Sequence, residues 1–217
     1  MVGEPESLHM SEPLKARIER HDYDRLLMLS DGVFAIAITL LALDLRLPDH
    51  WDGTMSQLFH TAGRPLVGYL FGFGLVGAFW IVHRRMLAEL AQVDRVITLL
   101  NLLLLGLVGL TPFVARMIAE AGPTRAIPFY LVSVASVLGA IALMRIWAMV
   151  TSALLHPGVD RRRWAIDTAF LTAGAIGVAA VGSWSIIAGG PVSSTPLLVV
   201  VLAVATGKQL SRLRRRR

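Results

Sequence analysis

Apolar residues are concentrated in six stretches of the chain, at about 25–47, 65–83, 96–117, 127–155, 164–189 and 194–210. A helix needs roughly 20 apolar residues to cross the core of a bilayer. The last stretch is the weakest, with Pro196 in its first turn, where a helix tolerates proline, and Lys208 near its end. No internal repeat is evident. The pattern therefore predicts an all-α membrane protein whose six transmembrane helices form one unit over residues 25–210.

The composition agrees with a membrane protein. Of the 217 residues 55% are hydrophobic and 17% are charged, whereas soluble domains carry about 25% charged residues. Cysteine is absent, which excludes disulfides, thiolate metal sites and cysteine nucleophiles. Residues 1–24 are polar and lack the pattern of a cleaved signal peptide, so we expect the first span to act as the insertion signal.

The charges between the spans predict the orientation, because Lys and Arg accumulate on the cytoplasmic side of a membrane. With six spans, one side has only Arg46, Arg64, Arg116 and Arg125. The other side has most of the basic residues, namely Lys15, Arg17, Arg20, Arg25, Arg84, Arg85, Arg95, Arg161, Arg162, Arg163, Lys208, Arg212 and Arg214 to Arg217. Both the N-terminal segment 1–24 and the basic tail 211–217 are thus predicted to be cytoplasmic.

Two local patterns concern the second span. The preceding connection, residues 48–64, is too short and polar to cross a bilayer, but Trp51, Met55, Leu58 and Phe59 fit one face of a short interfacial helix. Within the span, Gly68 and Gly72 are suited to close packing between helices.

The first span has two chemically different faces. At about 100° per residue, Ile36, Leu40 and Leu43 fall on one stripe, and Ser30 and Asp31 lie on the other side of the helix. An ionisable group at membrane depth either lines a pathway for polar solutes or pairs with another group to stabilise the structure. Spacing alone leaves two interpretations open: the apolar stripe faces lipid, or it lines a central pore shared by several copies of the chain.

A resemblance bears on this choice. The run Arg25-x-x-x-Leu29-Ser30-Asp31 resembles the R-x-x-x-F-S-D signature of the transmembrane protein 175 family of potassium channels, found in lysosomes and in many prokaryotes. The similarity extends to Trp80-Ile81-Val82-His83 and to Asn101, and is close over most of residues 20–120. One departure is Leu29, which stands where the family usually has phenylalanine and so has less aromatic area for packing.

The resemblance implies a potassium-permeable channel in the plasma membrane, assembled as a homotetramer whose first helices surround the pore. Carried over to this chain, the pore constriction is Ile36, Leu40 and Leu43. The signature residues would form a hydrogen-bonded network within each subunit that sets the first helix in place; they are Arg25, Ser30, Asp31, Trp80, His83 and Asn101.

Two polar residues are candidates for the edge of that pore. Thr39 could add a hydroxyl beside the constriction, and Asp44, near the outer end of the helix, could raise the local concentration of cations. The network is expected to be structural, and the only metal expected is the potassium ion in transit. No cofactor is implied.

Other features suggest less. The tail RLRRRR favours anionic lipid headgroups over nucleic acid, because it directly follows the last span. Arg145 is expected either to extend toward the cytoplasmic side or to pair with Asp167, and a structural pair is favoured over a voltage sensor. No enzyme motif is present, so we expect no catalysis. Two alternatives to a channel stay open: a proton-coupled carrier that uses Asp31 and His83 as a relay, and a membrane scaffold that conducts nothing.

Overall fold

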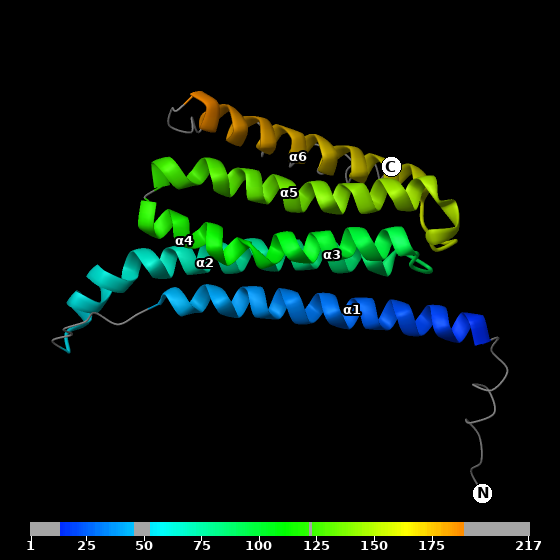
Figure 1. The fold of residues 1–217 in the computed structure, drawn as a ribbon, viewed down its shortest axis with the longest axis horizontal. Helices are drawn as coiled ribbons and strands as arrows, with labels where there is room; N and C mark the ends of the chain where they lie inside the picture. Colours follow the sequence, from blue (N-terminus) through cyan, green and yellow to red (C-terminus); the bar gives the residue numbers. More distant parts are fainter. Residues whose placement is uncertain (1–13, 46–52, 122, 189–217) are drawn as a thin grey trace, which may run out of the picture.

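The computed structural model describes residues 14–45, 53–121 and 123–188, and this part of the chain is helical (Figure 1). The predicted sixth span, 194–210, and the basic tail, 211–217, lie outside the described residues. The α-helices are α1 (Leu14–Leu41), α2 (Met55–Ala88), α3 (Arg95–Gly109), α4 (Thr111–Ala121), α5 (Pro123–Val150) and α6 (Arg161–Ala188), with short 3-10 turns at Ala42–Asp44 and Ser152–Leu154.

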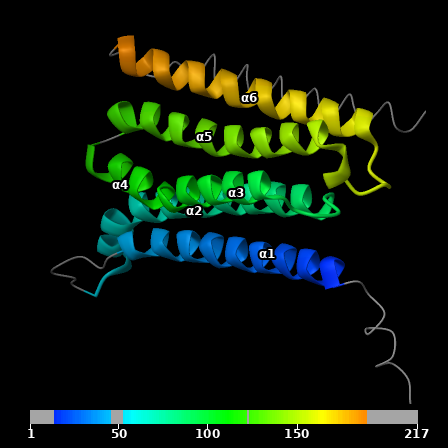
Figure 2. The same cartoon turned by 45° about the vertical axis from the view of Figure 1, so that its right-hand side comes forward.

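The helices lie side by side along the long axis of the molecule. Figures 1 and 2 show α1 on one outer side, α2, α3 and α4 next to it, then α5, with α6 on the opposite outer side. α1 packs on α2 and α3, while α6 packs mainly on α5. The protein is therefore a layered helical bundle in which α1 and α6 each leave one long face uncovered by the described chain.

Within the described ranges, four stretches are long and apolar enough to cross a membrane: Gly68–Ala88, Arg95–Met117, Arg125–Val150 and Arg161–Ala188. They correspond to the second to fifth predicted spans. α1 differs from these four stretches in charge. Each of the four includes an 18-residue window with at most two charged residues, whereas every 18-residue stretch of α1 includes Asp24, Arg25 and Asp31. Together these helices make the chain a multi-pass membrane protein.

The third predicted span, 96–117, is interrupted, since α3 ends at Gly109 and α4 begins at Thr111. Pro112 lacks the N–H that would bond to the carbonyl of Val108 four residues earlier. The buried hydroxyl of Thr111 donates to that carbonyl instead. The side chain thus replaces the hydrogen bond that proline removes, and the two helices continue as one span with a break.

The second and fourth spans have different ends from those predicted. α2 begins at Met55, where the Thr54 hydroxyl accepts a hydrogen bond from Gln57 N at 3.3 Å. The expected separate interfacial helix is therefore the start of α2, and Figure 1 shows these first turns inclined to the rest. Pro65 within α2 accounts for such a bend. α5 stops at Val150 instead of 155.

α5 stops there because the α5–α6 loop pairs with the α2–α3 loop. Ala91 N donates to Leu154 O at 2.8 Å, and His156 N donates to Glu89 O at 3.0 Å. These bonds form an antiparallel bridge between Leu90 and Leu155. We call the two segments, residues 89–94 and 151–160, the loop pair. It joins the ends of α2 and α5 at the end of the bundle where α1 begins (Figure 1).

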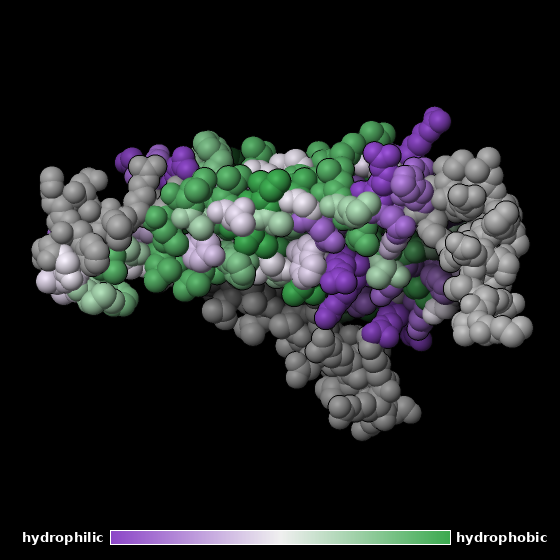
Figure 3. All heavy atoms as spheres, turned by 90° about the horizontal axis from the view of Figure 1, so that it is seen from below, coloured by the Kyte–Doolittle hydropathy of each residue, from purple (hydrophilic) through white to green (hydrophobic). Residues whose placement is uncertain are grey.

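Charge is concentrated at this same end. The exposed arginines at the end of α2 and the starts of α3 and α6 are Arg84, Arg85, Arg95, Arg161, Arg162 and Arg163. Figure 3 shows one face of the molecule, with apolar side chains over its middle and polar ones gathered toward the end at which α1 begins. The loop pair thus lies where the apolar belt of the bundle meets a polar rim.

The contact between α1 and α2 depends on a glycine. A Cβ at Gly72 would lie 3.1 Å from a methyl carbon of Leu41, whereas a Cβ at Gly68 would meet nothing within 4 Å. Only Gly72 therefore has the close-packing role that the sequence suggested for both.

We expect Gly72→Leu to separate α1 from α2 and destabilise the protein by about 1–3 kcal/mol, measured by thermal unfolding in detergent. Gly68→Leu is the matched control, and an equal loss in both variants would contradict this packing.

Candidate functional site: the faces of α1

One face of α1 is buried against its own subunit. Residues spaced three or four apart form this face, namely Leu26, Ser30, Phe34, Ala37 and Leu41. Residues at this spacing lie on one side of a helix, and the side they form here packs on α2 and α3. The rotation of α1 in the subunit is therefore fixed by packing along five helical positions.

A chain of hydrogen bonds crosses this buried contact and joins three helices. His83 Nε2 of α2 lies 2.7 Å from Asn101 Oδ1 of α3, and Asn101 Nδ2 donates to Ser30 Oγ of α1 at 3.0 Å. Ser30 Oγ in turn donates to the carbonyl of Leu26 at 2.7 Å. All three side chains are buried.

The directions of these bonds follow from the chemistry of each group. Because an amide oxygen only accepts, His83 Nε2 must carry the proton that Asn101 Oδ1 receives. The Asn101 amide then donates to Ser30, whose own proton goes to the helix backbone. Each link has one donor and one acceptor, so these buried polar groups have partners without any carboxylate.

Asp31 belongs to a second, more exposed group. Its Oδ1 accepts a hydrogen bond from Trp80 Nε1 at 2.7 Å. The guanidinium carbon of Arg84 lies 5.3 Å from the centre of a Trp80 ring, within the range of a cation–π contact. Asp31 is thus tied to α2 of its own subunit at the edge of the buried face, while its side chain stays exposed.

Arg25 does not take part in either group. Its side chain is exposed, and among the described residues it has no hydrogen bond or ion pair. The structure therefore brings together five of the six signature residues, in two separate groups, and leaves Arg25 on the outer surface of α1.

Two further contacts of α1 were not apparent from the sequence. The Phe34 ring packs on the His83 ring with 5.5 Å between their centres. Tyr23 Oη donates to Leu87 O at 3.0 Å. Burial, and to a lesser extent the carboxylate of Asp24, raises the pKa of Tyr23, so its hydroxyl stays protonated and able to donate. The spacing of Phe34 from Ser30 was the available signal for the first contact; for the second there was none.

The opposite face of α1 carries the predicted constriction residues. Ile36 is 59% exposed, Leu40 40% and Leu43 62%. Thr39 is also exposed, and its hydroxyl donates to Ile36 O at 2.9 Å. Asp44 lies in the 3-10 turn after α1. The apolar stripe therefore points away from the subunit, toward lipid or toward another copy of the chain.

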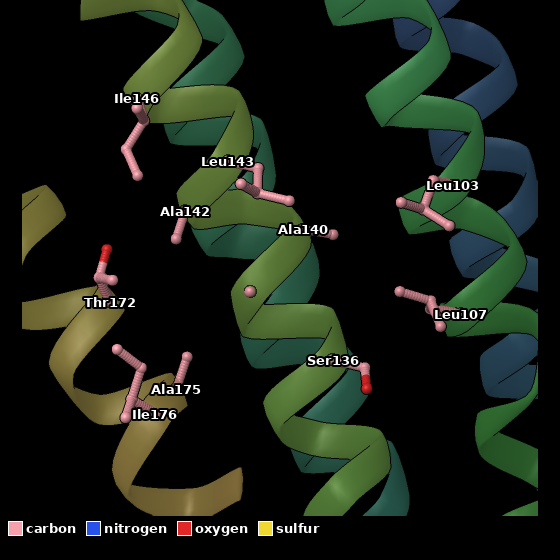
Figure 4. Close-up of a pocket in the computed structure, with 11 residues that line it drawn as sticks. Leu103, Leu107, Ser136, Ala140, Ala142, Leu143, Ile146, Thr172, Ala175 and Ile176 are labelled. Atoms are coloured by element: carbon pink, nitrogen blue, oxygen red, sulfur yellow. The ribbon is translucent and has the colours of Figure 1, made fainter.

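The other features of the bundle offer less chemistry. A groove of about 310 Å³ between α3, α5 and α6 is lined by Leu103, Leu143 and Ile176 among other apolar side chains (Figure 4). The hydroxyls of Ser136 and Thr172 at this groove donate to carbonyls of their own helices. In the described ranges no three acidic or histidine side chains are grouped to hold a metal ion.

Arg145 makes its direct contacts with Trp164 and Thr168, while the carboxylates of Glu89 and Asp167 interact with it electrostatically. Its guanidinium stacks 3.8 Å from the centre of the Trp164 ring. Its Nε donates to Thr168 Oγ1 at 2.9 Å, and its Nη2 donates to Trp164 O at 3.3 Å. Trp164 Nε1 donates back to Arg145 O at 3.0 Å. The buried cation thus joins α5 to α6 through an aromatic face and oxygen acceptors.

Comparison with known proteins identifies the family. The model described as endosomal/lysosomal potassium channel TMEM175 matches residues 25–112, which run from the start of the signature on α1 to the break after α3. The chain belongs to the TMEM175 family.

Curated relatives resemble the chain over part of their length. A potassium channel of Streptomyces collinus is 37% identical over 60% of this chain and 66% of its own. A potassium channel of Chamaesiphon minutus is 35% identical over 47% and 52% of the two chains. The human endosomal/lysosomal proton channel TMEM175 is 30% identical over 69% of this chain and 30% of its own. The chain thus spans less than two thirds of each of these relatives.

The hydrogen-bonded chain can be tested on its central residue. Asn101→Ala leaves the His83 ring N–H without its buried acceptor, which costs about 1–3 kcal/mol, and it removes the donor to Ser30 Oγ, which keeps its own bond to Leu26 O. We expect a clear drop in the unfolding temperature in detergent. Thr98→Ala, one turn earlier on α3, removes only an exposed bond to Asp94 O and should change stability little. An Asn101→Ala protein as stable as the wild type would contradict this role.

Proposed function

We propose that the chain is a potassium-permeable cation channel that conducts passively, with α1 of four copies around a shared pore and Ile36, Leu40 and Leu43 as its constriction. The observation that carries the proposal is the division of α1: its polar network is turned into its own subunit, and its apolar stripe is exposed. Membership of the TMEM175 family and the channel names of the relatives support conduction.

The charges of α1 favour a protein or water environment over lipid for the parts of its surface that its own subunit leaves exposed. Asp24, Arg25 and Asp31 are all exposed in the single subunit. A charged side chain facing the hydrocarbon of a bilayer costs several kcal/mol. Packing α1 against other copies around an aqueous axis avoids that cost. The four more apolar spans, α2, the α3–α4 pair, α5 and α6, would then face the lipid.

An aliphatic constriction controls ions by wetting. Rings of leucine or isoleucine offer no ligand to an ion, so a narrow ring is dry and closed, and it must widen to conduct. Discrimination then arises from the cost of removing water, which is lower for potassium than for sodium. Thr39 adds oxygen lone pairs beside the ring, because its proton is already given to Ile36 O.

The hydrogen-bonded groups have a positioning role in this proposal. Ser30, His83 and Asn101 hold α1 at one rotation, and Asp31 with Trp80 holds its edge. A turn of α1 would break these bonds and would move Ile36 away from the axis. Arg25, which has no such bond, would lie toward the cytoplasmic end of the pore-lining helix.

The remaining assignments rest on the sequence. We propose that residues 25–210 form one six-helix channel unit in the plasma membrane, with segment 1–24 and tail 211–217 in the cytoplasm and the tail near anionic headgroups. We propose no cofactor, no nucleic acid partner and no catalytic activity.

A proton-coupled carrier is the main alternative, and some animal relatives are named proton channels. A relay through Asp31 and His83 would need a hydrogen-bonded connection, but within the described part of the chain these residues belong to separate groups. Flux measurements in proteoliposomes separate the possibilities. A steady ohmic potassium current supports the channel, strict dependence on a pH gradient supports a carrier, and no flux leaves a scaffold.

The constriction is tested by side-chain size. Leu40→Ala should widen a ring of leucines and increase the single-channel current, with weaker discrimination between potassium and sodium in bi-ionic recordings. Leu102→Ala is the matched control, because Leu102 of α3 is also an exposed leucine, 48% against 40% for Leu40. Identical conductance in wild type, Leu40→Ala and Leu102→Ala would place Leu40 outside the lumen.

The shared axis is tested by cross-linking, for which a chain without native cysteine is well suited. Ile36→Cys should form disulfide-linked dimers in oxidised membranes and should make the current sensitive to Cd²⁺, because symmetry-related thiols meet near the axis. Leu102→Cys should remain monomeric under the same oxidation. Cross-linking of Leu102→Cys with none at Ile36→Cys would reverse the proposed arrangement.

A further inference from the structure

A hollow of about 490 Å³ lies at the loop pair, at the end of the bundle where the arginines gather. Its lining combines two kinds of surface. Leu155, Pro157 and Val159 supply apolar contacts, and His156 and Arg161 supply polar ones. Sites for small molecules have similar volumes and a similar mixture of an apolar wall with a few polar groups.

The walls of this hollow are fixed by hydrogen bonds between the loops. Besides the two backbone bonds of the bridge, Gln92 Nε2 donates to Ala153 O at 3.3 Å. Trp147 Nε1 donates to Asp94 Oδ2 at 2.8 Å, which holds the end of α5 against the start of α3. The hollow is therefore formed before any ligand arrives, and binding would require little ordering of the loops.

Two side chains of the lining suit a phosphate group. Arg161 carries the planar guanidinium that binds phosphate oxygens in pairs. His156 Nδ1 accepts a hydrogen bond from Gly158 N at 3.3 Å, so in the neutral ring the proton is on Nε2, which is a donor. The start of α6 is not itself the site, because Asp160 Oδ1 already accepts from Arg162 N and Arg163 N.

The charges around the hollow are predominantly positive. Arg162 and Arg163 follow directly after Arg161 and are exposed. The carboxylates of Asp94 and Asp160 accept hydrogen bonds from neutral N–H groups of Ile97, Trp147 and the first turn of α6, so both keep their negative charge. Glu89 is the remaining exposed carboxylate of the loop pair. The six exposed arginines at this end of the bundle outnumber these three carboxylates, so the net charge favours an anion.

We propose that this hollow binds the phosphate headgroup of an anionic membrane lipid. The location decides the source of the phosphate: the hollow lies where the membrane-spanning parts of α5 and α6 end, and headgroups are found at that level of a bilayer. Arg161 and His156 bind the phosphate, and Leu155, Pro157 and Val159 contact the glycerol and the first carbons of the acyl chains. The proposal rests on the membrane spans and is independent of ion conduction.

The experiment measures lipid retained by the purified full chain. The protein is reconstituted in vesicles of phosphatidylcholine with phosphatidylglycerol, extracted in mild detergent, and weighed by native mass spectrometry. We expect phosphatidylglycerol to be retained over phosphatidylcholine, and Arg161→Gln to lower that retention about tenfold, the usual effect of losing a charge-assisted hydrogen bond. Arg162→Gln removes the same charge one residue away, outside the lining, and should stay within about twofold of the wild type.

A second variant tests the hollow without removing charge. Ala153→Trp fills it from the α5–α6 loop and should also abolish retention. Equal losses in Arg161→Gln and Arg162→Gln would show attraction to the arginines as a whole and would overturn the site. Retention unchanged in both Arg161→Gln and Ala153→Trp would overturn it as well. Competition by soluble glycerol phosphate at millimolar concentration would assign the hollow to free phosphates, against the lipid.

Discussion

The arrangement of this protein depends on one amide side chain, that of Asn101. It is the point at which α1, α2 and α3 are connected by polar groups inside an apolar bundle. An amide has both a donor and an acceptor, so it can receive the proton of His83 and pass on its own to Ser30. A carboxylate could not donate, and an apolar side chain would leave the buried N–H of His83 without an acceptor and Ser30 with only its bond to Leu26 O. The orientation of α1, and with it the direction of its apolar stripe, follows from this residue.

The sequence was sufficient to predict the helical membrane class, four of the spans and the two faces of α1. These features follow from long apolar stretches and from the regular spacing of Ser30 relative to Ile36 and Leu40, which local rules describe well. The grouping of Ser30, His83 and Asn101 came from a family resemblance, because residues so far apart in sequence have no local pattern that joins them. The position of Arg25 followed neither from the local spacing nor from the resemblance, which placed it in the network. An exposed arginine has no packing partner that determines its position.

The differences between expectation and structure have specific causes. The break after α3 depends on Thr111 and Pro112, which look like an ordinary part of an apolar stretch. α5 is shorter than predicted because a backbone bridge between two loops competes with the helix for Leu154 and Leu155. A pair of Arg145 with Asp167 was expected, yet the direct contacts of Arg145 are an indole face and the oxygens of Trp164 and Thr168. Tertiary partners decide each case, and single-sequence patterns do not contain them.

The break between α3 and α4 links two neighbouring positions in a way that limits how they can change. As long as position 112 is proline, the carbonyl of Val108 needs a donor from elsewhere, and the hydroxyl at position 111 is that donor. Serine could replace Thr111, but alanine or valine would leave that carbonyl inside the bilayer with only the Leu110 N–H, which Gly106 O and Leu107 O share. Once the proline is gone, the requirement disappears with it. Natural variation at these two positions should therefore be correlated, with the hydroxyl lost only in chains that have already lost the proline.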